Sequence, residues 1–274
     1  MKNAIVGVCR FSYLGRGGFA NSNMSLEERV ELLFDADRLT ERFAMFETLC
    51  LPSLAAQTDR DFKLVVLSSD ALPNDAKERL RELANRHAFL TLAFLPPMGP
   101  LLSTRRAYRK GWEDGTPFVT GFRIDDDDAV AVDYIARTRV LADRAIADGW
   151  ADADHPLVVA FHRGVYVDML APSAPFYDFR ETAPLGLASA MITRADDQVN
   201  IFRWNHRRLA AHVRTITDPT DQMFLRTLHT TNDSDRKVPP GAEPIETATF
   251  CAELRARFGV DPDRLQALMQ GPRP

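Results

Sequence analysis

The sequence predicts an α/β protein built around a mixed β-sheet, and two observations support this. From residue 4 to residue 124, short apolar runs alternate with stretches of helical periodicity, which is typical of parallel strands joined by crossover helices. From residue 157 to residue 193, apolar runs follow one another with shorter connections, which favours a mixed rather than a purely parallel arrangement.

The first half of the chain gives the clearest alternation. Residues 4–9 form the first expected strand, and Ser25 opens a helix with Glu28 three residues later, at the spacing of a capping box. Helical periodicity continues to about Leu54, with a break expected near Pro52. The other elements expected here are strands at 61–68, 89–95 and 118–124 and helices at 74–86 and 103–114.

The second half is expected to contain a helix at 133–148, strands at 157–161, 164–170 and 187–193, and a helix at 218–228. Pro219 suits the first turn of that last helix. A proline-containing linker follows at 238–246, and two short helices are expected at 248–258 and 262–270. The sequence therefore predicts one domain over residues 1–237, with the linker and a helical extension over residues 238–274.

Composition narrows the class of protein. The chain has 34 basic and 38 acidic residues, a net charge of −4, which argues against a general nucleic-acid binder. Its three cysteines, Cys9, Cys50 and Cys251, form no CxxC pair, so neither a zinc site nor a disulfide framework is expected. No apolar run approaches the ~20 residues that cross a bilayer. We expect a cytoplasmic protein without a transmembrane segment, and peripheral membrane contact stays open.

Four consecutive aspartates, Asp125 to Asp128, follow the strand expected at 118–124. Four adjacent like charges repel one another, and a divalent cation held by carboxylate oxygens and substrate phosphates relieves that repulsion. Ligands of α/β sheets also bind where strands end. This position therefore favours a metal–phosphate site over the alternative, a solvated acidic turn before the next helix.

Two segments together carry a family resemblance. Residues 49–66 (LCLPSLAAQTDRDFKLVV) resemble a stretch of family 2-like glycosyltransferases with the GT-A fold, and Asp125 to Asp128 occupy the place of their DxD motif. The segment Phe-Arg-Ile-Asp-Asp-Asp-Asp at 122–128 resembles, more narrowly, the corresponding segment of a bacterial group described as putative rhamnosyl transferases. The resemblance spans roughly residues 3–230.

The resemblance implies a GT-A-like fold and transfer of a sugar from a nucleotide-diphosphate donor to a hydroxyl acceptor, with inversion, using Mn²⁺ or Mg²⁺. A dTDP-rhamnose donor follows from the family name alone. By the family pattern Asp125 contacts the ribose and Asp127 the metal. Asp126 is expected to turn back into the sheet or to a backbone partner, and Asp128 is a second metal candidate or a helix cap.

The nucleotide of such a donor lies near the ends of the first two strands, where this chain has Arg10, Ser69 and Asp70. Asp70 either accepts from a pyrimidine N–H or caps the next helix. The family usually has an acidic residue directly after the second strand, where this chain has serines. Arg105 and Arg106, on the helix before the aspartates, are candidates for a phosphate contact, and Arg109 is not distinguished from them.

A hydroxyl acceptor needs a base, which inverting GT-A enzymes place near the start of a late helix. Asp221 is the expected base and Asp218 the expected N-cap, although both could be caps; Asp196–Asp197 are the fallback. His229 could add a metal ligand, as a late histidine does in some GT-A enzymes. Trp204 stacks on an acceptor sugar or, alternatively, packs in the core.

Two other classes of protein stay open. A nucleotidyltransferase also needs clustered carboxylates to bind metal, and it would release pyrophosphate from a nucleoside triphosphate. A non-catalytic relative would bind a saccharide without turnover, because fold alone does not establish function.

Overall fold

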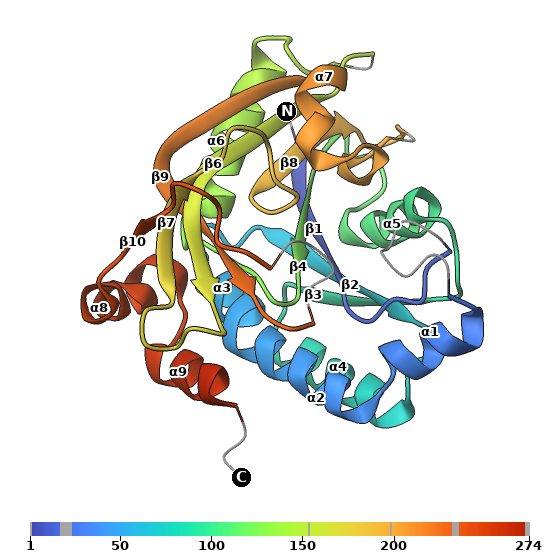
Figure 1. The fold of residues 1–274 in the computed structure, drawn as a ribbon. Helices are drawn as coiled ribbons and strands as arrows, with labels where there is room; N and C mark the ends of the chain where they lie inside the picture. Colours follow the sequence, from blue (N-terminus) through green and yellow to red (C-terminus); the bar gives the residue numbers. More distant parts are fainter. Residues whose placement is uncertain (1, 17–23, 153, 198, 232–235, 272–274) are drawn as a thin grey trace.

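The computed structural model describes residues 2–16, 24–152, 154–197, 199–231 and 236–271. A ten-stranded sheet forms the centre, with the strand order β10-β7-β6-β8-β4-β1-β2-β3, while β5 and β9 pair with each other and β9 also pairs with β6 (Figure 1). The strands are β1 Asn3–Arg10, β2 Phe62–Ser69, β3 Leu90–Leu95, β4 Phe118–Asp125, β5 Ala129–Val130, β6 Leu157–Asp168, β7 Phe176–Arg180, β8 Ser189–Arg194, β9 Arg214–Leu228 and β10 Glu243–Pro244.

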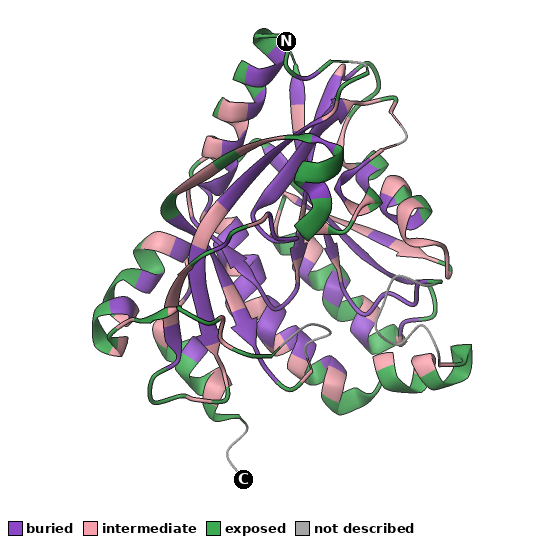
Figure 2. Cartoon of the chain, turned by 45° about the horizontal axis from the view of Figure 1, so that its top comes forward, coloured by how far each residue is buried: buried purple, intermediate pink, exposed green. Residues whose placement is uncertain are grey.

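Helices cover both faces of the sheet, and their inward sides are buried while their outward sides are exposed (Figure 2). The helices are α1 Leu26–Leu33, α2 Ala36–Met45, α3 Leu51–Ala55, α4 Asn74–Arg86, α5 Pro100–Tyr108, α6 Tyr134–Ala147, α7 Leu209–His212, α8 Thr247–Phe258 and α9 Pro262–Gln270. A π-type turn spans Phe46–Cys50, and 3-10 turns span Arg109–Gly111, Ile201–Arg203 and His206–Arg208.

The first half confirms the expected alternation. Strand β1 pairs in parallel with β2 and β4, and β2 pairs in parallel with β3. The capping box at Ser25 and Glu28 is present. The long helical stretch breaks at Phe34 and Asp35 rather than near Pro52, which lies in the first turn of α3, where its missing N–H costs little.

The second half differs more from expectation. The two strands expected at 157–161 and 164–170 are one continuous strand, β6, which pairs antiparallel with β7 and β8. Gly164 lies within it because a Cβ there would meet the Phe224 ring at 2.3 Å, so glycine marks a close approach of β9 rather than a strand end. The α/β class and the mixed sheet flanked by helices are confirmed.

The helix expected at 218–228 is wrong, because this segment is the second part of strand β9. Strand β9 runs parallel to β6 and buries Met223, Phe224 and Leu225 against the core. Pro219 is tolerated because the register jumps across it, from Asp218 to Gln222, at an irregularity that leaves its missing N–H outside the ladder.

The segment expected to be a linker joins the same structure. Strand β10 pairs antiparallel with β7, and the backbone N–H of Ile245 donates to the carbonyl of Phe176 at 2.9 Å. Helices α8 and α9 add Phe250, Phe258 and Leu265 to the main hydrophobic core. The C-terminal helices therefore share a core with the sheet. No helix in the described ranges is long and apolar enough to cross a membrane.

Candidate active site

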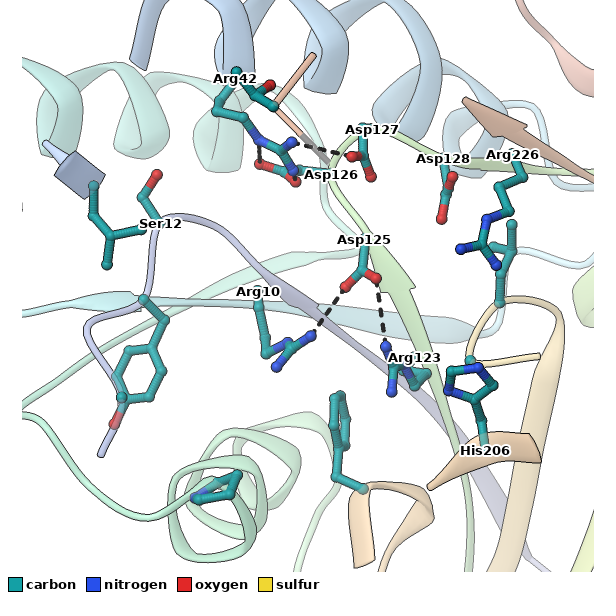
Figure 3. A pocket seen from close by; sticks show the side chains of 18 of the residues that line it. Arg10, Ser12, Arg42, Arg123, Asp125, Asp126, Asp127, Asp128, His206 and Arg226 are labelled. Atoms are coloured by element: carbon teal, nitrogen blue, oxygen red, sulfur yellow. Dashed lines mark hydrogen bonds and ion pairs between the residues drawn. The ribbon is translucent and has the colours of Figure 1, made fainter. Parts of the chain in front are cut away.

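A pocket of about 600 Å³ opens where β1 and β4 end side by side (Figure 3). The parallel register places Arg10, the last residue of β1, opposite Asp125, the last residue of β4. The four aspartates therefore lie at the carboxyl edge of the sheet, as the position of their motif predicts. The polar side chains that line the pocket include Arg10, Ser12, Arg29, Arg38, Arg42, Arg123, Asp125, Asp126, Asp127, Asp128, Arg203, Asn205, His206, Arg226 and Thr231.

Asp125 lies between two guanidinium groups. Its carboxylate oxygens are 3.6 Å from Arg10 and 3.4 Å from Arg123. Burial raises the pKa of Asp125, but the charges of Arg123 and Arg10 outweigh it, so the pKa is lower than usual and the carboxylate is ionised. A Cβ at Gly186 would lie 2.6 Å from Arg123 Cζ, so a glycine there leaves room for this side chain.

Arg42 reaches from α2 to the next two aspartates (Figure 3). Its Nε donates to Asp126 Oδ2 at 2.9 Å, and its Nη1 donates to Asp127 Oδ2 at 3.0 Å. Arg42 and both carboxylates are buried, so one guanidinium offsets two carboxylates out of contact with bulk water. Such a buried arrangement is stable only while every partner stays in place.

Asp127 has a second buried partner. His229 Nε2 lies 2.9 Å from Asp127 Oδ2, and the other ring nitrogen contacts the Thr231 hydroxyl at 2.9 Å. Burial raises the pKa of Asp127, but the Arg42 charge and the His229 hydrogen bond outweigh it and hold the pKa well below its usual range. Asp127 is therefore ionised, and His229 lies beside the carboxylate for which the sequence predicts a metal role.

Asp128 has the opposite electrostatics. Burial, and then the negative charge of Asp127, raise its pKa well above the usual value, although the Arg226 charge opposes this. The backbone N–H of Thr227, on β9, donates to Asp128 Oδ1 at 3.3 Å. Asp128 thus turns to β9 and is neither an exposed turn residue nor the cap of α6, whose N-cap is Asp133.

Among the described residues that line the pocket, positive formal charges outnumber negative ones. They include four aspartates and seven arginines: Arg10, Arg29, Arg38, Arg42, Arg123, Arg203 and Arg226. Guanidinium groups bind phosphate oxygens through paired N–H donors. A ligand with two or more negative charges, such as a diphosphate, complements this lining.

His206 also lines the pocket, near Arg123 (Figure 3). Burial, and then the charges of Arg123 and Arg226, lower the pKa of His206 to about 4, so its imidazole is neutral at pH 7. Within the described part of the chain, its ring makes no hydrogen bond. A pKa this low makes the ring a weak proton acceptor while no anion offsets the neighbouring arginines.

Three of the expected nucleotide contacts lie inside the pocket and four lie outside it. Arg10, Asp125 and Asp126 line the pocket. Ser69 and Asp70 are absent from its described lining, and Ser69 Oγ instead accepts from the N–H of Ala71 at 3.1 Å. Arg105 and Arg106, together with Arg109 and Asp196–Asp197, line a separate recess of about 490 Å³.

The residues expected to act as base and N-cap also lie outside the described pocket lining. Asp218 and Asp221 are on β9, and their carboxylates contact Arg137 at 2.6 and 2.7 Å. Asp221 is exposed, and neither residue belongs to the described pocket lining. The helix that suggested Asp221 does not exist, and its role as a base stays a prediction. Trp204 does line the pocket, and its ring stacks on His212.

Gln57 of the AQT segment supports the acidic turn from behind. Its side-chain N–H donates to the carbonyl of Ala131 at 2.7 Å, and its side-chain oxygen accepts from the N–H of Ile135 at 2.9 Å. The N–H of Thr58 donates to the carbonyl of Val132 at 2.8 Å. These bonds attach the segment that follows α3 to the residues just after the aspartates.

The pocket side chains that sequence reasoning missed are mostly arginines. Arg42, Arg123 and Arg226 come from α2, β4 and β9. Arg123 has a local signal, because it alternates with the apolar residues before Asp125. Arg42 and Arg226 have none, because only the tertiary fold brings them to the aspartates.

The carboxylates fit a cation of one particular kind. The described residues contain no cluster of three or more His, Cys, Asp or Glu side chains that could hold a metal by themselves. Mg²⁺-type ions usually take one or two carboxylates and complete their shell with substrate phosphates and water. Asp127 and Asp128 could supply those two carboxylates.

These features define an α/β protein with an arginine-rich pocket around clustered aspartates. Residues 4–241 match the model of a family described as "Putative rhamnosyl transferase". The match covers most of the chain, so the chain belongs to this family. No curated protein matches the chain.

Solved structures resemble the chain only distantly. Residues 1–349 of TarS from S. aureus align at 14% identity and a TM-score of 0.42, over 83% of this chain and 60% of that one. The same TarS fragment in complex with UDP aligns at 15% identity and a TM-score of 0.41, over the same shares. A putative nucleotide-diphospho-sugar transferase from Desulfovibrio desulfuricans aligns at 9% identity and a TM-score of 0.41, over 98% of both chains. The chain thus spans less than two thirds of the TarS fragment.

Proposed function

We propose that the chain transfers a sugar from a nucleotide-diphosphate donor to a hydroxyl acceptor. The carrying observation is the pocket itself, whose described lining places arginines around the ionised Asp125 and Asp127 where β1 and β4 end. Family membership supports the choice of a sugar as the transferred group, and rhamnose rests on the family description alone.

The proposed roles follow the geometry. Arg10 and Arg123 bind the donor's phosphates, since both guanidiniums point to the pocket beside Asp125. Asp127 and Asp128 would hold a Mn²⁺ or Mg²⁺ ion, with Asp128 losing its proton as the ion binds, and the ion would supply further positive charge beside the diphosphate. Asp125 is free to accept from a donor hydroxyl on its pocket side. Because the leaving diphosphate gains negative charge, these preplaced cations lower the barrier.

The acceptor hydroxyl must lose a proton as it attacks, and His206 is the proposed recipient. It lines the pocket and is neutral at pH 7. Its pKa of about 4 makes it a weak base in the empty pocket, and a bound diphosphate would raise that pKa by offsetting the charges of Arg123 and Arg226. Direct attack on the donor then inverts the anomeric carbon. Asp221 is the alternative base, and this role would require an acceptor that reaches from the pocket to Asp221 on β9.

The first test is thermal stability with a panel of nucleoside diphosphates and sugar nucleotides, with and without Mn²⁺. A ligand that binds the native state raises the melting temperature, and we expect one nucleotide base to give the largest shift. Arg123→Met should weaken that diphosphate about 10-fold to 100-fold, as expected for losing a charged hydrogen-bond donor.

Arg106→Met is the matched control, because it removes the same charge from the separate recess. It should leave affinity unchanged. The absence of a shift with every diphosphate and every sugar nucleotide would reject the proposal. A larger response to nucleoside triphosphates, with pyrophosphate release, would favour a nucleotidyltransferase instead.

A further inference from the structure

The acidic turn is already neutralised by the chain's own cations. Asp126 and Asp127 share Arg42, at 2.9 and 3.0 Å, and Asp127 Oδ2 also contacts His229 at 2.9 Å. Asp125 lies between Arg10 and Arg123. Each ionised carboxylate of the turn therefore has a cationic neighbour before any ligand arrives.

A divalent cation entering alone would have to compete with Arg42 for Asp126 and Asp127. Arg42 is buried and donates to both carboxylates, at 2.9 and 3.0 Å. Charges interact strongly in a buried setting, where water screens them weakly. A diphosphate reverses the balance, because it adds negative charge beside the arginines and supplies oxygen ligands of its own.

We infer that Arg42 is an internal counter-ion that prevents a divalent cation from binding alone, so that the cation enters only together with the diphosphate. The inference rests on the proposed function, because it concerns the same metal and the same donor group. Arg42 is thus a positioning residue: it holds Asp126 and Asp127 in place, and the cation and the diphosphate depend on each other for binding.

The test measures Mn²⁺ binding directly, by electron paramagnetic resonance and calorimetry, without a turnover assay. For the wild-type chain, Mn²⁺ affinity should rise at least tenfold when the nucleoside diphosphate chosen by the thermal panel is present. Reciprocity requires that Mn²⁺ raise the affinity for the diphosphate by the same factor. Equal Mn²⁺ affinity with and without the diphosphate would overturn the inference.

Arg42→Met removes the internal cation and should strengthen binding of Mn²⁺ alone at least tenfold. Arg38→Met is the matched control, because Arg38 lies one turn earlier on α2, lines the same pocket and donates to Ser12 Oγ at 3.1 Å. It should change Mn²⁺ affinity less than threefold. If both variants strengthen Mn²⁺ equally, the effect is general pocket charge and the specific role of Arg42 is rejected.

Folding must be checked, since Arg42 is buried. Circular dichroism and the melting temperature establish whether Arg42→Met is folded at the assay temperature, and Arg42→Lys, which keeps the charge, should leave binding of Mn²⁺ alone as weak as in wild type. Stronger binding of Mn²⁺ alone by Arg42→Lys would contradict the inference. Failure of every diphosphate to bind rejects the proposed function, whereas binding of Mn²⁺ alone to wild type rejects only this inference.

Discussion

Two acidic clusters of the chain look alike in sequence and differ in their surroundings. The pocket cluster, Asp125 to Asp128, is buried at its centre and contacts Arg42 and His229. The rim cluster, Asp218 and Asp221, shares one partner, Arg137, and its Asp221 side chain is 63% exposed. Water screens the charges of the exposed rim cluster more than those of the buried pocket cluster. Aspartates of the two clusters should therefore differ strongly in what they contribute to stability and to function.

Breaking the central pair of each cluster should give the largest difference. Arg42→Met leaves two buried carboxylates without their shared cation and should destabilise the fold by about 3 kcal/mol. Arg137→Met breaks ion pairs that are partly solvated and should cost below about 1 kcal/mol. Urea unfolding of both variants measures this. Similar losses would show that burial does not distinguish the clusters.

The same comparison separates what the sequence predicts from what it does not. The position of Asp125 follows from the strand at 118–124, because a run of buried apolar residues must end at the sheet edge. Arg10 follows in the same way from the first strand. Both were predicted from local pattern, and the parallel register of β1 and β4 brings them together.

Contact partners that are distant in the chain could not be predicted from the local sequence pattern. Arg42 is 84 positions from Asp126 in the chain, and nothing in its helix distinguishes it from the other arginines of that stretch. The helix expected at 218–228 failed for a related reason. Its helical signal, a proline suited to the first turn, was overridden by pairing with β6 and by burial of Met223 and Phe224.

Within the pocket cluster, adjacent aspartates should respond oppositely to pH. The pKa of Asp127 is lowered in the folded chain, so its stabilising contribution is complete above the usual carboxyl pKa of about 4 and is lost as the pH falls below it. The pKa of Asp128 is raised, so its contribution is present at low pH and is lost as the pH rises through the folded value.

The corresponding amides make this measurable. Asp127→Asn should lower stability at pH 7 by about 1–2 kcal/mol, with the loss shrinking toward pH 3. Asp128→Asn should be neutral or stabilising at pH 7, by up to about 1 kcal/mol, since it removes a buried carboxyl that resists ionisation. Each variant is the other's control in urea unfolding between pH 3 and pH 8. A comparable loss in both at pH 7 would contradict the difference.

The smallest expected effect is that of the rim cluster on turnover. Asp221→Asn keeps the shape of an exposed side chain outside the described pocket lining, so release of nucleoside diphosphate from the donor should change less than about twofold.

His206→Gln, inside the pocket, should lower the rate about 100-fold while leaving diphosphate affinity in place, as expected for losing a general base. With a His206 pKa near 4 in the free protein, kcat/KM of the wild type should stay flat from pH 5 to pH 8. If Asp221→Asn lowered the rate more than His206→Gln, the base would be Asp221, as the sequence predicts.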